Sequence, residues 1–375
     1  MSSICKKSIS FYSDAPEWGG QEILSARIAA IVAETCDVTF FYSCDKFAEF
    51  LPASVKQVKL PYHAETPFPI FRDRFKGKTQ KAKELFQKEN IRNLVLCPGN
   101  IERCLPGLWA ANKLGIPIVS YLPLAFSQNE THANLGKLRD FLAKGIYKKV
   151  DHWIVNSPYQ KRLIARFVDK NIETLLNPLA WDILAPAKKP QLPLNIAILG
   201  RIFFEQKGHD ILPDIALLLK RKNIDVHFMI VGEGPHENIL RKKIKEKAVE
   251  DLVEFTGWMP SEKIQELLLN NIDLLLIPSH FESGPIVLFE ALQCGCPVLV
   301  ADAEYTDDYV LPPWMLFKEG SADDAAEKIS RYAENWNEQQ FLDLREKLFH
   351  DRTDDDFKKN VIQIFDKLIT EGILK

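Results

Sequence analysis

The chain has 375 residues, of which 46% are hydrophobic and 26% are charged, and its formal net charge is -3. This composition excludes an intrinsically disordered chain, and the length favours two domains of ordinary size, with a cleft between them, over a single one. No apolar run approaches the roughly 20 residues that a membrane-spanning helix needs, so we expect any association with a membrane to be peripheral.

The charge is unevenly distributed along the sequence. Residues 1–185 hold 25 Lys and Arg against 18 Asp and Glu, a net charge of +7, which leaves -10 for the remainder. The asymmetry suggests an anionic partner for the first half, either a membrane surface or a phosphorylated acceptor; an uneven scatter of solvated side chains explains it equally well. The seven cysteines form no CxxC pair and residues 8–12 offer no signal-peptide core, so we expect a reduced, cytoplasmic protein.

Short apolar runs in the first half alternate with segments of helical periodicity. They predict a helix at residues 21–34 and strands at residues 9–12, 38–42, 93–97, 116–121 and 152–155. Such alternation is typical of a parallel sheet with helices on both faces. Prolines then crowd residues 178–193, where periodicity is lost, and we place a domain boundary between residues 185 and 186.

A second series of the same kind follows this stretch. Strands are predicted at residues 195–199, 226–231, 253–256, 274–277 and 297–301, and helices at residues 210–222, 235–247, 261–270 and 285–293. We therefore predict an α/β fold with two Rossmann-like, doubly wound parallel-sheet domains, residues 1–185 and 186–355. An amphipathic helix at about residues 356–375 can pack back on the first domain.

The loops after the strands of the second half are the candidate site, because ligands in open α/β sheets bind beside the carboxyl ends of strands. The first loop holds Gly200 and Arg201 and, at the entry to the next helix, Lys207. Fixed positive charge beside helix-terminal amides suits a diphosphate. Taken alone, such a motif more often marks two solvated basic side chains near a turn.

The second loop places Gly232 and Gly234 before a proline, where they would let a nucleotide approach the backbone closely. Taken alone, GxG before Pro more often marks an ordinary turn. The missing third glycine of the dinucleotide fingerprint also argues against NAD.

The third loop opens the sequence PSHFESGPIVLFEA at residues 278–291. Ser283 is a candidate helix cap, Gly284 leaves the backbone uncovered, and Pro285 suits a first helical turn. A helix N-terminus with free amides is therefore expected at Pro285, and such amides favour an anion.

Two glutamates belong to the same segment. Glu282 lies in the loop, where it can meet a sugar, while Glu290 lies more than one turn into an apolar helix, where it can meet a ribose. An apolar helix has little structural reason to hold a carboxylate, although a solvated position on a half-exposed helix is the alternative for Glu290.

Together the three loops resemble the family 4 glycosyltransferases (glycosyl transferases group 1), which have the GT-B fold of two Rossmann-like domains facing an interdomain cleft. Besides the loops, the likeness rests on the seven residues between Glu282 and Glu290 and on residues 255–259 and 290–298; it covers residues 195–305, with fainter matches at residues 19–22, 150–157 and 177–178. The resemblance implies a retaining transferase that moves a sugar from UDP or GDP to a glycan or lipid-linked acceptor in surface polysaccharide or lipopolysaccharide biosynthesis. The second domain would bind the nucleotide sugar and the first the acceptor.

The resemblance also implies roles for individual residues. Arg201 and Lys207 would neutralise the departing diphosphate, since breaking a glycosyl–phosphate bond builds negative charge that fixed cations stabilise. Glu282 would bind sugar hydroxyls and Glu290 the ribose. The remaining expected donor contacts are Gly19, Gly20, Gly200, Gly232, Gly234, Ser283, Gly284, Pro285 and Ile286. Members of the family generally work without a metal ion, and the sequence has no DxD motif or His-rich cluster, so we expect no metal and no other cofactor.

Two features of the first half bear on this interpretation. Gly19 and Gly20, between a strand and a helix, would let the backbone approach the donor or acceptor, although an ordinary turn is equally consistent with them. Relatives commonly place a His after the strand at 116–121, whereas this chain has Pro123, and we expect His132 at the surface. A sugar-nucleotide epimerase of the same fold and a weakly active binding subunit therefore stay as alternatives.

Basic residues cluster at residues 72–83 and 137–149, the second time with Leu138, Phe141, Leu142 and Ile146 between them. Such a segment can lie on anionic lipid, or it can be a charged helix face in solvent. Nucleic-acid binding is not expected, because the positive excess is modest and is not interleaved with aromatic residues.

Overall fold

The computed structural model describes residues 7–65, 77–131, 133–169 and 171–375. His132 and three members of the first basic cluster, Arg72, Arg74 and Lys76, lie outside the described residues. The chain divides into two compact units, one formed by Met1–Leu176 with Asp354–Lys375 and the other by Asn177–Thr353. Of the helices that the structure describes, none is long and apolar enough to cross a bilayer.

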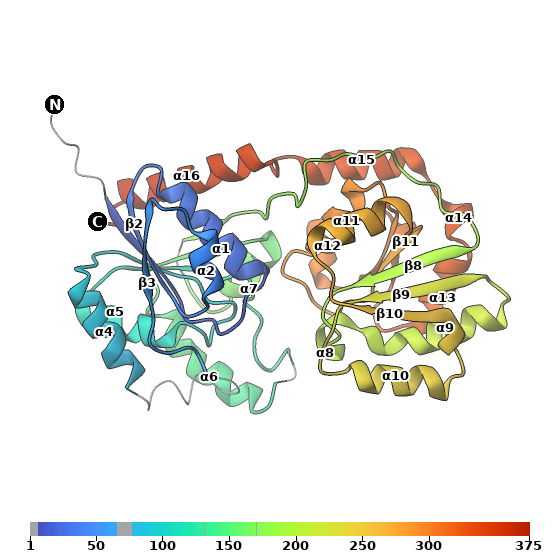
Figure 1. Ribbon diagram of the computed structural model, residues 1–375, viewed down its shortest axis with the longest axis horizontal. Coiled ribbons are helices and arrows are strands. Elements are labelled where there is room, and N and C mark those ends of the chain that lie inside the picture. The colour runs from blue at the N-terminus through green and yellow to red at the C-terminus, as the bar shows by residue number, and fades with distance from the viewer. Residues whose placement is uncertain (1–6, 66–76, 132, 170) are drawn as a thin grey trace. The chain divides into compact units, whose positions relative to one another are not determined.

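The described part of the first unit is built on a seven-stranded parallel sheet in the order β3-β2-β1-β4-β5-β6-β7 (Figure 1). The strands are β1 (Ser8–Ser13), β2 (Asp37–Tyr42), β3 (Val55–Lys59), β4 (Leu94–Leu96), β5 (Ile118–Tyr121), β6 (His152–Val155) and β7 (Ile172–Thr174). The helices are α1 (Gly20–Val32), α2 (Lys46–Phe50), α4 (Lys78–Lys88), α5 (Leu105–Leu114), α6 (Gly136–Tyr147), α7 (Pro158–Ala165) and α16 (Asp354–Thr370). The central strands β4, β5 and β6 are buried along their whole length because helices cover both faces of the sheet.

The second unit has a six-stranded parallel sheet in the order β10-β9-β8-β11-β12-β13. Its strands are β8 (Leu194–Leu199), β9 (Val226–Val231), β10 (Val253–Gly257), β11 (Leu274–Ile277), β12 (Val298–Asp302) and β13 (Leu316–Lys318). Its helices are α8 (Phe204–Lys207), α9 (Leu212–Arg221), α10 (Glu237–Glu246), α11 (Ser261–Asn270), α12 (Ile286–Gln293), α13 (Ala322–Ser330), α14 (Tyr332–Asn335) and α15 (Glu338–Phe349). The prediction of two Rossmann-like α/β domains with doubly wound parallel sheets is confirmed.

The structure divides the chain nine residues earlier than the predicted boundary at 185/186. The proline-rich segment belongs to the second unit because its backbone pairs with residues there: Ala185 N donates to Gln293 O and Lys188 N to Gly295 O, both at 2.8 Å. A Cβ on Gly295 would lie 1.9 Å from Pro186 O, so only glycine allows this close approach. The loss of periodicity in the sequence therefore correctly indicated an extended segment. The backbone contacts, which the sequence does not reveal, attach this segment to the second unit.

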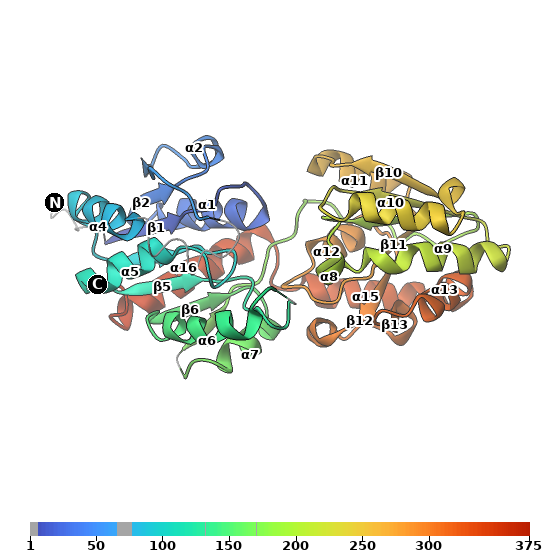
Figure 2. The ribbon, with the colours of Figure 1, turned by 90° about the horizontal axis from the view of Figure 1, so that it is seen from below.

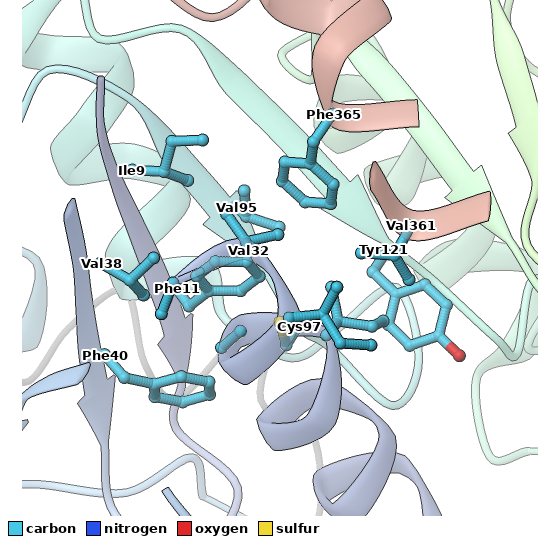
Figure 3. Close-up of a cluster of buried hydrophobic side chains, with 14 of the residues drawn as sticks. Ile9, Phe11, Val32, Val38, Phe40, Val95, Cys97, Tyr121, Val361 and Phe365 are labelled. Carbon is cyan, nitrogen blue, oxygen red and sulfur yellow. The ribbon is translucent and has the colours of Figure 1, made fainter. Parts of the chain in front are cut away.

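The helix α16 packs on the first unit, although it follows the whole of the second unit in the chain. Figure 3 shows Val361 and Phe365 of this helix in the same buried cluster as Phe11 of β1 and Val95 of β4. The rings of Phe11 and Phe365 lie 5.9 Å apart. Burial of its apolar face against the sheet and α1 gives this helix its place in the fold.

The order of the second sheet brings β8 and β11 together as neighbours. Consecutive connections leave these two strands in opposite directions across the sheet, so a crevice forms between the loops that follow them. The helix that starts after each loop, α8 and α12, lies at the same end of the sheet in Figure 1 and in Figure 2. The first and third predicted loops are the two loops at this point.

Candidate functional site

The loop after β8 directs Lys207 toward the neighbouring loop. Gly200 has a φ of +131°, and a Cβ there would lie 3.4 Å from Lys207 Cε, so the lysine side chain runs back along this glycine. Lys207 ends α8, and Gly208 then turns the chain with a φ of +61°. A Cβ on Gly208 would lie 2.1 Å from Pro278 O, so glycine is required for the two loops to approach.

A lysine–glutamate pair joins the loops that follow β8 and β11. Lys207 Nζ lies 2.5 Å from Glu282 Oε1, and Ser279 Oγ donates to the same carboxylate oxygen at 2.7 Å. The Lys207 and Glu282 side chains are 18% and 7% exposed. His280 N also donates to Gln206 O at 2.8 Å, which fixes the two loops through the backbone. The structure thus brings together a predicted cation and a predicted carboxylate that are separated by 75 residues in the sequence.

The second loop packs against the first, and this packing explains its glycines. A Cβ on Gly232 would lie 2.1 Å from Gly200 O, and one on Gly234 would lie 2.3 Å from Ile202 O. Ile202 N donates to Glu233 O at 3.0 Å, which holds the two loops together. We predicted that these glycines let a nucleotide approach the backbone. In the structure, the absence of a Cβ atom at each of them lets the first loop pack closely against the second.

The helix α12 begins one residue later than predicted. Pro285 occupies its N-cap position without a side-chain cap, and Ser283 lies two residues before that position, so the prediction that Ser283 caps the helix is wrong. The first amides of a helix have no partner within it, and the N-cap residue Pro285 has no side chain that can accept from one of them. Gly284 has a φ of +151°, a conformation that a side chain rarely adopts, and Ile286 is exposed.

Glu290 lies inside α12 and is 9% exposed, so the alternative of a solvated position is contradicted. Burial raises the pKa of its carboxyl group from 4.5 to about 7. In the described part of the chain no hydrogen bond or ion pair joins the carboxyl group of Glu290 to another residue. A buried carboxyl group without a stabilising partner is unusual in a helix that packs as core, which is consistent with a ligand-binding role.

Three residues near the lysine–glutamate pair were missed by sequence reasoning. Ser279 donates a hydrogen bond to Glu282 and orients its carboxylate. In the sequence, only the motif PSxxES could have indicated this role. Tyr305, on the short 3-10 helix η3 (Glu304–Asp308), is buried, and burial and the charge of Glu282 raise its pKa. His209 is also buried, and burial and the charge of Lys207 lower its pKa to about 3. Neither the tyrosine hydroxyl nor the imidazole nitrogens has a partner among the described residues.

The remaining predicted residues make none of these contacts in the part of the chain that the structure describes. Arg201 follows Gly200 directly and is exposed. Gly19 and Gly20 belong to the first unit, where Gly19 is the N-cap of α1 and Gly20 its first residue. The φ of Gly19 is -158°, an extended conformation that any residue adopts, so backbone strain does not require glycine there. Pro123 is buried two residues after β5.

Residues 181–348 match the family model described as glycosyl transferases group 1. The match covers almost the whole of the second unit, Asn177–Thr353. WcaL of Escherichia coli (strain K12), a glycosyltransferase assigned to colanic acid biosynthesis, is 33% identical over 120 residues. That alignment covers 30% of this chain and 29% of the relative, so the chain matches less than a third of that protein's length.

Two further similarities extend over most of the chain. The lipopolysaccharide 1,6-galactosyltransferase of Salmonella typhimurium is 23% identical over 337 residues, which cover 86% of this chain and 89% of the relative. A crystal structure of HepE from Anabaena in complex with UDP and glucose superposes with a TM-score of 0.73 at 17% identity, covering 97% of this chain and all of that one. The architecture is thus the GT-B fold, as the sequence motifs predicted.

The family match contains every predicted site residue of the second unit, from Gly200 to Glu290. Gly19, Gly20 and Pro123 lie outside it. The loop cluster built on β8, β9 and β11 is therefore the candidate active site.

Proposed function

We propose that this protein is a group 1 glycosyl transferase that moves a sugar from a UDP- or GDP-sugar to a glycan or lipid-linked acceptor, with retention at the anomeric carbon. The similarity to a lipopolysaccharide galactosyltransferase over most of both chains supports a role in lipopolysaccharide or other surface polysaccharide synthesis. The similarity in fold to HepE, whose structure holds UDP and glucose, supports a uridine nucleotide as the first donor to test.

The observation that carries the proposal is the Lys207–Glu282 pair between the loops after β8 and β11. Cleavage of the bond between the sugar and its diphosphate leaves negative charge on the departing phosphate oxygen. Lys207, with Arg201 six residues before it, is suited to neutralise that charge, and the uncapped amides of α12 add to it. Glu282, released from the lysine when the diphosphate binds, accepts hydrogen bonds from the sugar hydroxyls.

Glu290 completes the donor site in this proposal. Its buried carboxylate accepts hydrogen bonds from the ribose hydroxyls, so the ligand supplies the partner that the protein does not. During transfer an acceptor hydroxyl loses its proton and bonds to the anomeric carbon as the bond to the diphosphate breaks. The proton leaves with the nucleoside diphosphate, and the new glycosidic bond has the configuration of the old one.

The test measures release of UDP or GDP from a panel of nucleotide sugars, with and without lipopolysaccharide-type acceptors. We expect Lys207→Met and Glu282→Gln to lower the rate by roughly 10²- to 10³-fold. Lys220→Met is the matched control, because Lys220 lies in the same unit and pairs with Asp251 at the surface. Full activity in both site variants would refute the site.

The product distinguishes the proposal from its alternatives. NMR of the glycoside should show the anomeric configuration of the donor, whereas an epimerase would form a new free nucleotide sugar without any acceptor. A binding subunit would bind nucleotides yet release no diphosphate over hours. We also propose that transfer is independent of metal, so that EDTA leaves the rate unchanged; a rate restored only by Mg²⁺ or Mn²⁺ contradicts that part.

A further inference from the structure

The helix α6 of the first unit exposes apolar side chains to solvent. Leu138 and Phe141 lie three residues apart on one face and are 47% and 67% exposed, and Leu135, immediately before the helix, is 62% exposed. Leu135 also has a φ of +59°, a conformation that leucine adopts at a cost. Neighbouring large apolar residues exposed in this way mark an interaction surface more often than an ordinary solvated face.

Lysines border these apolar residues. Lys137, Lys144 and Lys148 are exposed and follow one another at intervals of seven and four residues, which places them along one line of the helix. No ion pair joins any of the three to a described acidic residue. In α10 of the second unit, by contrast, Arg241 pairs with Glu237 and Lys242 with Glu246, and Lys247 at the C-cap pairs with Asp214.

The opposite face of α6 is fixed to the rest of the unit. Arg139 Nε and Nη2 form a two-point ion pair with the buried carboxylate of Glu102, at 2.7 and 2.5 Å. Asp140, the acidic residue of the helix, accepts from Gln128 N and Asn129 N and is not available to the lysines. A Cβ on Gly136 would lie 2.6 Å from the Cα of Asn129, so the helix begins in direct contact with the preceding loop.

The inner residues Ala143, Ile146 and Tyr147 are buried, so the exposed face is the one that packing leaves outside. In Figure 1 the helix runs along the edge of the first unit opposite α16. The geometry is therefore a rigid amphipathic helix with apolar side chains outward, flanked by positive charge that the protein does not neutralise.

From this arrangement we infer that α6 docks on the surface of an anionic lipid bilayer. Leu138 and Phe141 enter the boundary between head groups and acyl chains, while Lys137, Lys144 and Lys148 contact the lipid phosphates. The excess of positive charge in residues 1–185 favours the same partner. A protein partner would not require a line of unpaired lysines, and a nucleic acid would not require the two apolar side chains.

Flotation with vesicles tests the inference without any assay of transfer. The full-length protein should bind vesicles of equal parts phosphatidylglycerol and phosphatidylcholine and should not bind vesicles of phosphatidylcholine alone. Replacement of Lys137, Lys144 and Lys148 by Gln should lower the partition coefficient roughly 100-fold, because each lysine near an anionic surface contributes about fivefold. Leu138→Gln with Phe141→Gln should lower it at least tenfold.

The matched control replaces three exposed lysines by Gln, Lys242 and Lys245 of α10 and Lys247 at its C-cap, which removes the same charge from a different helix. The inference is overturned if this control loses as much binding as the α6 lysine variant, or if the wild type does not bind anionic vesicles. Binding that is unaffected by Leu138→Gln with Phe141→Gln overturns the insertion of the apolar face. Far-UV circular dichroism with unchanged melting temperatures shows that each variant is folded.

Discussion

Replacement of Glu282 by Gln is the most direct test of the lysine–glutamate pair. The carboxylate is 7% exposed and accepts from Lys207 Nζ and from Ser279 Oγ. A neutral amide of the same shape still accepts one hydrogen bond but no longer compensates the ammonium group. A hydrogen bond to a charged group contributes about 1.5–3 kcal/mol to stability. Because the lysine keeps some access to water, we expect Glu282→Gln to lower the free energy of unfolding by an amount near the lower end of that range.

A double-mutant cycle measures the interaction itself. Urea unfolding of the wild type, Glu282→Gln, Lys207→Met and the double variant should give a coupling energy of about 1–2 kcal/mol. UDP at 100 times its dissociation constant should stabilise the wild type by about 2.7 kcal/mol and Lys207→Met by much less. A coupling energy below about 0.3 kcal/mol would refute the pair, and equal stabilisation of both proteins by UDP would refute its role at the diphosphate.

Three further predictions concern stability. Gly208→Ala should destabilise the second unit by at least about 3 kcal/mol in urea unfolding, because the new Cβ would meet the carbonyl oxygen of Pro278. The control Gly320→Ala, at a similar φ of +69° with open space around it, should destabilise the unit by about 1–2 kcal/mol. Equal losses of stability would contradict the close approach of Gly208 to Pro278. Since burial raises the pKa of Glu290 from 4.5 to about 7, the folded state holds its proton more tightly than the unfolded state, so stability should fall by up to about 3 kcal/mol as the pH rises from 4.5 to 7. Glu290→Gln should lack that fall in a pH series of melting temperatures, and an unchanged slope would refute the buried carboxyl group. Phe365→Ala should cost about 3–5 kcal/mol and the exposed control Gln363→Ala less than 1, as urea unfolding can show; similar values would contradict the packing of α16.

The sequence predicted the central strands and the loops after them well, because both depend on local pattern. The buried apolar runs of β4 to β6 can only be strands covered on both faces, and a strand order of this kind brings the loops after β8 and β11 together. Three edge strands, β3, β7 and β13, were missed, whereas the edge strand β10 was predicted. In β3, Lys56, Gln57 and Lys59 are polar and the run is short, so its identity as a strand comes from pairing with β2.

Only the site residues that belong to a local sequence pattern were predicted. Lys207 and Glu282 carried motif signals, but Tyr305 lies beyond β12 and reaches the vicinity of Glu282 through the tertiary fold. The prediction that Ser283 caps α12 was wrong because Pro285 is still extended, so that the helix starts only at Ile286. The glycines of the second loop are required for contact with Gly200 and Ile202, which no local pattern reveals, and their role in binding a donor stays a prediction.

The placement of α16 affects how the chain acquires its structure during synthesis. The first unit lacks buried side chains such as Phe357, Val361 and Leu368 until the ribosome has made the whole second unit. The second unit is continuous in sequence and can therefore fold first, while the earlier part of the chain waits with an open apolar surface on β1 and α1. A fragment that stops at residue 353 should for this reason aggregate during expression, even though it contains every strand of both sheets.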